Sequence, residues 1–213
     1  MTLTIAELYP SILGESTHAG RPCVLVRLTG CNLRCSYCDS AFAFHGGTER
    51  TLEELLAEVR ATGLRWVLIT GGEPLLQSGI IAFIDQLVDE GFSVLVETSG
   101  ALDIGPVNPK AITILDIKCP GSGETEKMHW ANLTKLRPRD EVKFVISDRR
   151  DYEWSRQIIS EQSLGKENAV LFSPVHGVIT PRDLAQWMLE DRSPAHLQLQ
   201  IHKYIWEPGK RGV

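Results

Sequence analysis

Residues 66–98, WVLITGGEPLLQSGIIAFIDQLVDEGFSVLVET, contain one complete strand–helix–strand unit. WVLIT (66–70) is a short apolar run typical of a buried strand, and SVLVET (93–98) is a second one. Between them, residues 78–91 have the length and apolar spacing of a helix that Gly91 would close. Such alternation of strand and helix predicts a parallel sheet covered by helices.

The alternation continues on both sides of this unit. Thr51 and Glu54 have the spacing of a capping box, and Thr180 followed by Pro181 is typical of a helix start. A doubly wound sheet and an open barrel both fit, but polar residues at the ends of the strands favour the barrel. We therefore expect an α/β fold, a partial (β/α) barrel, in a single domain over 1–213. Further strands are expected at 23–28, 112–118, 142–147, 169–173 and 197–205, and further helices at 51–63, 151–163 and 180–191.

The composition is that of an ordinary globular protein, with 43% hydrophobic and 23% charged residues. A net charge of −5 with scattered Lys and Arg argues against a nucleic-acid surface. The first residues lack the pattern of a signal peptide, and no apolar stretch has the length of a membrane span, so we expect a cytoplasmic protein. Five cysteines, three of them crowded together, suit metal ligation better than disulfides.

The segment TGCNLRCSYCDSAF (29–42) places Cys31, Cys35 and Cys38 on one loop after a predicted strand. Thiolates this close in sequence can converge on one metal centre. Three interpretations are open: unrelated free thiols, a zinc ion with Cys23 or His45 as fourth ligand, or an iron–sulfur cluster. A 4Fe–4S cluster on three thiolates leaves one iron open to another ligand.

The spacing C-x3-C-x-(aromatic)-C, with Tyr37 in the aromatic position, resembles the signature of the radical S-adenosylmethionine (SAM) superfamily. The resemblance implies a 4Fe–4S cluster held by the three cysteines, with SAM chelated at the remaining iron. It also implies a 5′-deoxyadenosyl radical that abstracts hydrogen from the substrate, and a partial α/β barrel. Tyr37 would lie beside the adenine.

LITGGEP (68–74) places two glycines and a carboxylate directly after a buried strand. Alone, this is most simply a glycine-rich turn. Beside the three-cysteine loop it resembles the GGE motif of the superfamily, which implies that Gly72 and Glu73 hold the amino group of SAM. Other SAM contacts are implied at later strand ends, although each of these could be an ordinary polar loop: Thr98, Ser99, Lys118, Cys119, Pro120, Ser173, Pro174, Val175 and His176.

Over nearly its full length the chain resembles the 7-carboxy-7-deazaguanine synthase family, most closely in SILGESTHAGRPCVLVRLTGCNLRCSYCDS (11–40) and LQIHKYIWEPGKRGV (199–213). The resemblance implies a lyase of queuosine (deazapurine) biosynthesis that contracts the ring of 6-carboxy-5,6,7,8-tetrahydropterin and releases ammonia. SAM would be regenerated and Mg²⁺ would assist. A flavodoxin- or ferredoxin-type electron donor and a homodimer are also implied.

The resemblance implies a substrate site built from several strand ends. Arg27 could bind a carboxylate in a bidentate contact, or form a buried ion pair with Glu15. Ser40 is implied as a Mg²⁺ ligand, with helix capping as its alternative. Val213 would act through its carboxylate, unless the tail is frayed. The implied substrate residues are Ile12, Leu13, Gly14, Glu15, Arg27, Thr70, His202 and Val213.

Two other functions remain open: a radical SAM activating enzyme that acts on a glycine of a partner protein, and a zinc-stabilised module without activity. Arg27, Glu15 and the C-terminal segment favour a closed polar pocket over a protein-binding surface. Leu13, Ser16 and Ser40 depart from the family pattern, which usually has Gln, Gly and Thr there. No residue can be assigned to proton transfer.

Overall fold

The computed structural model describes residues 1–213 as an α/β protein built on one nine-stranded sheet. The strands lie in the order β3-β1-β2-β4-β5-β6-β7-β8-β9. Their bounds are β1 Thr2–Ile12, β2 Pro22–Leu28, β3 Thr48–Thr51, β4 Trp66–Gly71, β5 Ser93–Thr98, β6 Ile112–Ile117, β7 Glu141–Ile146, β8 Ala169–Pro174 and β9 His196–Leu197. The helices are α1 Leu52–Ala61, α2 Ile80–Asp89, α3 Arg149–Glu161, α4 Pro181–Glu190 and α5 His202–Ile205.

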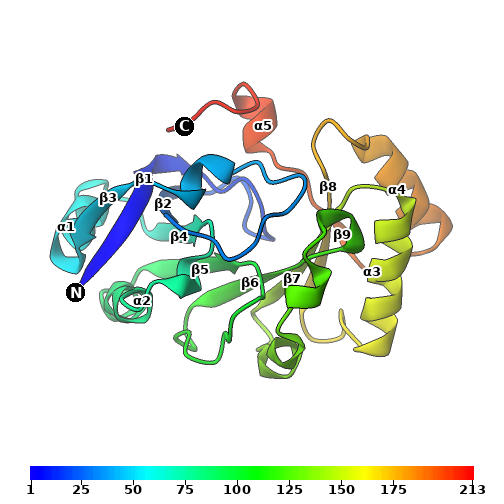
Figure 1. Ribbon diagram of the computed structural model, residues 1–213, viewed down its shortest axis with the longest axis horizontal. Coiled ribbons are helices and arrows are strands. Elements are labelled where there is room, and N and C mark those ends of the chain that lie inside the picture. Colours follow the sequence, from blue (N-terminus) through cyan, green and yellow to red (C-terminus); the bar gives the residue numbers. More distant parts are fainter.

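The parallel strands follow one another around the sheet in chain order, as Figure 1 shows. From β2 to β9 every neighbouring pair is parallel, whereas β1 and β3 are antiparallel additions at one edge. A doubly wound sheet would need a point at which the strand order reverses, and this order has none. The partial barrel expected from the sequence is confirmed.

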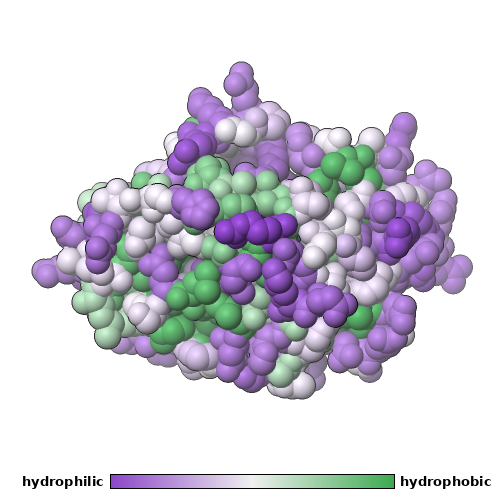
Figure 2. Space-filling view, in the orientation of Figure 1, coloured by the Kyte–Doolittle hydropathy of each residue, from purple (hydrophilic) through white to green (hydrophobic).

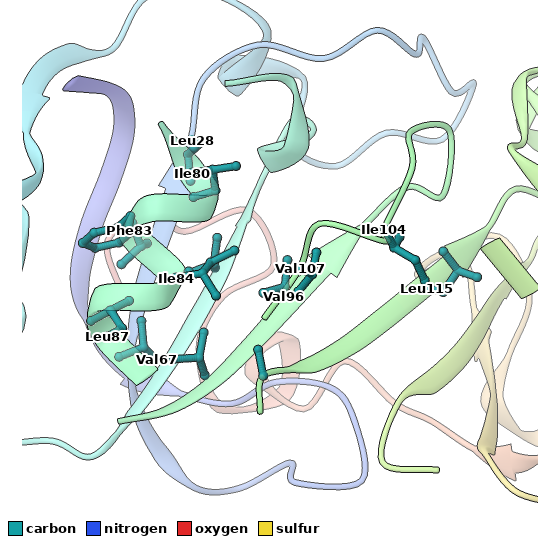
Figure 3. Packing of buried hydrophobic residues seen from close by; sticks show 14 of the residues in the cluster. Leu28, Val67, Ile80, Phe83, Ile84, Leu87, Val96, Ile104, Val107 and Leu115 are labelled. Carbon is teal, nitrogen blue, oxygen red and sulfur yellow. The ribbon is translucent and has the colours of Figure 1, made fainter. Parts of the chain in front are cut away.

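The hydrophobic core joins the sheet to its helices. In Figure 3, Ile84 of α2 points toward the strands that carry Val67 and Val96, and Phe83 and Leu87 lie on the same helix. All five side chains are fully buried, as expected for a helix with one apolar stripe on a parallel sheet. Because α2 occupies this face, the opposite face of the strands remains available for a site.

Local signals in the sequence set several boundaries correctly. Thr51 and Glu54 form the reciprocal capping box at the start of α1. Thr180 caps α4 by accepting a hydrogen bond from the Asp183 N–H. None of the helices has the length and apolar character that a membrane-spanning segment needs. Figure 2 shows hydrophilic residues over much of this face of the molecule, with smaller hydrophobic areas between them.

The expected strand over 197–205 is wrong. Only His196–Leu197 pairs as β9, and His202–Ile205 form the short helix α5. The expected alternation is also inverted, because Leu197 is 39% exposed while Gln198 is buried. The Ile201 N–H donates to the Gly14 carbonyl at 3.0 Å, which turns the chain across the barrel instead of along β8. Strands β1 and β3 were not anticipated.

Candidate active site

A cleft of about 420 Å³ lies at the C-terminal ends of the parallel strands. Alternate residues of β1, β2, β4 and β7 reach it, such as Leu25 and Arg27 on β2, because successive side chains of a strand point to opposite faces. Loops after the strands and the segment 200–213 complete its wall. In Figure 1, α5 and the C-terminus lie together beside β1. Parallel barrels commonly build their sites at this end.

The three-cysteine loop faces this cleft, since Cys31, Cys35 and Cys38 all line it. Burial raises the pKa of the Cys31 thiol, and it raises that of Cys35 to about 11. Cys23 lies elsewhere, in a small apolar cluster with Leu13. It therefore cannot be the fourth zinc ligand considered above. No three His, Cys, Asp or Glu side chains are grouped to hold a single metal ion.

The GGE turn packs directly against the cysteine loop. The Gly72 N–H donates to the Leu28 carbonyl at 3.2 Å, and the Glu73 N–H donates to the Gly30 carbonyl at 2.8 Å. A Cβ added at Gly72 would overlap the Gly30 carbonyl oxygen and the Cβ of Cys31. Glycine is required at 72 by this close approach of two backbone segments.

Glu73 is fully buried, and its carboxylate organises the neighbouring strand end rather than lining the cleft. Oε2 accepts from the Ser99 N–H at 2.7 Å and from the Ser99 hydroxyl at 2.5 Å. The Thr98 hydroxyl reaches both oxygens, and the Leu75 N–H donates to Oε1 at 3.0 Å. The carboxylate thereby fixes Thr98 and Ser99, which do line the cleft.

The remaining residues expected to bind SAM separate into two groups. Tyr37, Lys118, Val175 and His176 line the cleft, with the Tyr37 hydroxyl donating to the Val145 carbonyl at 3.2 Å. Cys119 is turned into the core, 3.3 Å from the Ser155 hydroxyl. Three others do not line the cleft either: Pro120, Ser173 and Pro174.

Residues 12–15 meet the C-terminal segment across the cleft. A Cβ on Gly14 would overlap the imidazole of His202, so the absence of a side chain at 14 makes room for that ring. Burial lowers the pKa of His202, although nearby Glu15 opposes this. Ile12, Glu15 and Thr70 also line the cleft, whereas Leu13 is buried in the small apolar cluster.

Arg27 is held by Glu7 and not by Glu15, which corrects the ion pair considered from the sequence. Its Nε donates to Glu7 Oε2 at 3.1 Å, and its Nη1 lies 3.4 Å from the Ser40 hydroxyl. Ser40 makes no capping hydrogen bond to the helical turn that follows it. Its hydroxyl donates to Asp39 Oδ1 at 2.9 Å, so an alcohol and a carboxylate lie together at the cleft.

The C-terminal tail packs over the part of the cleft that holds Glu7, Arg27 and Ser40. Arg211 donates to Glu7 Oε1 at 2.9 Å, and its guanidinium lies 4.0 Å from the ring centre of Phe42. The Ser11 hydroxyl donates to a Val213 oxygen at 2.8 Å. Lys203 pairs with Asp39 at 2.7 Å. The expected position of His202 and Val213 at the cleft is thus seen, although no strand carries them there.

A charged cluster on the cleft floor was missed by sequence reasoning. Lys143 contacts the carboxylates of Glu15, Glu97 and Asp116, and Asp116 also pairs with Lys118 at 3.0 Å. The signal was available, because a lysine in the middle of the apolar strand EVKFVI is unusual for a buried strand. The partners could not be read from the chain, since they come from separate elements.

Comparisons with known proteins agree with this arrangement. The family model described as the Radical SAM superfamily matches residues 25–115. The 7-carboxy-7-deazaguanine synthase of Koribacter versatilis is 45% identical over 99% of this chain and 100% of its own length. That of Chlorobaculum tepidum is 44% identical over 99% of this chain and 97% of its own.

Solved structures show the same fold at lower identity. QueE from Escherichia coli superimposes with a TM-score of 0.76 at 22% identity, over 93% of this chain and 94% of that chain. Streptococcus suis SuiB bound to S-adenosylmethionine gives a TM-score of 0.51 at 13% identity, over 79% of this chain and 44% of that chain.

Proposed function

The chain belongs to the 7-carboxy-7-deazaguanine synthase family of the radical SAM superfamily, and on this premise we propose that it converts 6-carboxy-5,6,7,8-tetrahydropterin to 7-carboxy-7-deazaguanine and ammonia. The observation that carries the proposal is that one cleft is lined both by the three-cysteine loop and by charged and hydrogen-bonding side chains. A small polar heterocycle suits such a cleft, whereas a protein substrate would need an open surface.

Membership of the radical SAM superfamily implies a 4Fe–4S cluster and SAM. The residues fit both groups: three thiols without a fourth protein ligand face the cleft, and the buried Asp116 Oδ1 there has no hydrogen-bond partner. When bound, the cluster and SAM supply a 5′-deoxyadenosyl radical that abstracts hydrogen from the substrate. Cys31, Cys35 and Cys38 would hold the cluster.

SAM would lie against the residues that the GGE turn organises. Gly72 keeps the backbone bare beside Cys31, and Glu73 orients Thr98 and Ser99 toward the ligand. Lys118 supplies a cation for the SAM carboxylate. Burial alone would lower the pKa of Lys118, but the adjacent Asp116 raises it, so the ammonium persists at neutral pH. Tyr37, Val175 and His176 would border the remainder of SAM.

The substrate would occupy the opposite part of the cleft. Glu7 holds the Nε of Arg27 and the Ser40 hydroxyl accepts from Nη1, which leaves Nη2 and the second N–H of Nη1 for a substrate carboxylate. Glu15 would accept from guanidine-like N–H groups, with Ile12, Gly14, Thr70, His202 and Val213 around the ring. Ser40 would bind Mg²⁺ together with substrate oxygens and water, an environment that this ion tolerates. Asp39 lies close enough to assist.

We also propose a homodimer and a flavodoxin- or ferredoxin-type electron donor. The three cysteines are only partly buried, which suits transfer from a docked protein. Both proposals come from the family resemblance, and neither affects the assignment of the cleft.

Anaerobic reconstitution with iron and sulfide tests the proposal. We expect about four irons per chain and a broad brown absorption, both lost in Cys35→Ala. Cys23→Ala is the matched control, because that thiol lies away from the cleft, and it should keep the iron. With the carboxytetrahydropterin, SAM, dithionite and Mg²⁺, the deazaguanine should form without proportional loss of SAM.

Two outcomes would reject the proposal. A colourless protein with one tightly bound zinc would exclude radical chemistry. A brown protein that cleaves SAM but leaves the pterin unchanged would favour the activating enzymes.

A further inference from the structure

Lys143 is the most deeply buried cation of the cleft. It lies on β7 opposite Asp116 of β6 in the strand register, and its side chain is only 4% exposed. Its Nζ lies 2.9 Å from Glu15 Oε2 and 3.3 Å from Asp116 Oδ2, and it also contacts Glu97 Oε1. A lysine with three carboxylate partners is satisfied in hydrogen bonds, and it has no remaining donor for the substrate.

The carboxylates are aligned by this single ammonium group. Glu15 uses its second oxygen to accept from Gln200 at 2.8 Å, and Glu97 uses its second oxygen to accept from Thr70 at 3.3 Å. Both residues line the cleft. Each of the two carboxylates therefore accepts at both of its oxygens, and Lys143 is the donor that the two share.

Charge balance shows why this cation matters. Glu15, Glu97 and Asp116 could carry three negative charges, against positive charges on Lys143 and Lys118. Buried carboxylates without a cation take up protons, because desolvation disfavours the charged form. Without Lys143, a protonated Glu15 could no longer accept from two N–H groups at once.

We propose that Lys143 is a positioning residue for the substrate, whose buried ammonium group holds Glu15 beside Glu97 and keeps Glu15 as an anionic acceptor for the guanidine-like N–H groups of the pterin. The inference rests on the proposed function for the identity of the substrate. Lys143 acts through Glu15 and does not itself contact the substrate.

The protonation behaviour of the cluster supports this role. Burial alone would raise the pKa of Glu15, but Lys143 and the Gln200 hydrogen bond lower it below its usual value. Burial raises the pKa of Glu97, Lys143 opposes this rise, and nearby Glu15 and Asp116 add to it. The other charged groups around the pair are Lys118 after β6 and His202 on α5.

The test measures steady-state kinetics and pH profiles of Lys143→Met and Lys143→Arg. In Lys143→Met we expect KM for the carboxytetrahydropterin to rise at least tenfold, with the iron content of the reconstituted protein unchanged. The acid limb of kcat/KM should move up by at least about one pH unit, because an adjacent cation stabilises the Glu15 carboxylate. Lys143→Arg should recover most of the KM and the acid limb. Lys166→Met, which removes an exposed lysine outside the cleft, is the matched control.

A second pair of variants keeps the inference testable if Lys143→Met does not fold. Glu15→Gln should raise KM to a similar extent, and Lys143→Met/Glu15→Gln, which removes one carboxylate together with the cation, should be no worse than Glu15→Gln alone. Additive losses would overturn the inference, as would a Lys143→Met enzyme with the KM and pH profile of the unaltered chain. If the unaltered chain cleaves SAM but makes no deazaguanine, the proposed function fails instead.

Discussion

The buried Glu73 carboxylate offers a sharp test of how the GGE turn works. The sequence alone suggested that Glu73 pairs with the amino group of SAM, whereas the structure shows both of its oxygens accepting hydrogen bonds from the protein. Glu73→Gln retains the size and shape of the side chain but replaces one acceptor oxygen with an NH₂ group. This variant therefore tests the loss of the charge and of one acceptor oxygen at constant side-chain size.

The size of the destabilisation in Glu73→Gln depends on which hydrogen-bond donors around the side chain can reorient. The Thr98 and Ser99 hydroxyls can rotate to accept from the new NH₂ group. The backbone N–H groups of Ser99 and Leu75 cannot, and they lie on different oxygens, so one of them must face another donor. A buried donor left without its charged acceptor costs about 2–4 kcal/mol in the free energy of unfolding.

Urea unfolding of the apoprotein, followed by circular dichroism at pH 7, measures this cost. With a urea dependence of about 2–3 kcal/mol per molar, the midpoint should fall by about 1 M. Glu126→Gln is the matched control, because Glu126 is exposed, and it should stay within about 0.5 kcal/mol of the unaltered chain. An unchanged midpoint in Glu73→Gln, together with lost SAM binding, would refute the reasoning and show that the carboxylate acts on SAM directly.

Three further variants probe the rest of the cleft. Gly14→Ala should lower kcat/KM at least tenfold, because its methyl group displaces the His202 imidazole. The control Gly105→Ala, on an exposed turn, should leave kcat/KM unchanged. Equal kinetics in the two variants would contradict the packing of His202 against Gly14. Arg211→Ala removes a half-exposed contact with Glu7 and Phe42, so the free energy of unfolding should change by less than about 1 kcal/mol. KM for the substrate should rise a few-fold relative to an Arg182→Ala control. An unchanged KM would mean that the tail does not close the site. Burial alone would raise the Asp116 pKa, but Lys118 and Lys143 hold it below its usual value, so its stabilising effect is present at neutral pH and is lost as pH falls through that lowered pKa. Urea unfolding at pH 7 and pH 3 should therefore show the difference between the unaltered chain and Asp116→Asn shrinking on acidification, and a constant difference would argue against the pairing.

Much of the fold was readable from local patterns in the chain. The apolar runs of β4 and β5, the stripe on α2 and the caps at Thr51 and Thr180 each depend on neighbours within a few residues. Such signals can be read from neighbouring residues alone. The segment 197–205 shows their limit: its alternation indicated a strand, but a hydrogen bond to Gly14, far away in sequence, turned the chain.

The sequence by itself determined the chemistry of this protein, because the spacing of Cys31, Cys35 and Cys38 and the GGE turn are local features on adjoining loops. Only the tertiary structure decided which charges meet. It paired Arg27 with Glu7, turned Leu13 and Cys119 away from the cleft, and placed Lys143 among three carboxylates from separate elements. The physical reason is that an ion pair depends on distance in space, and closure of the barrel brings together charged side chains that are as many as 204 residues apart in the chain.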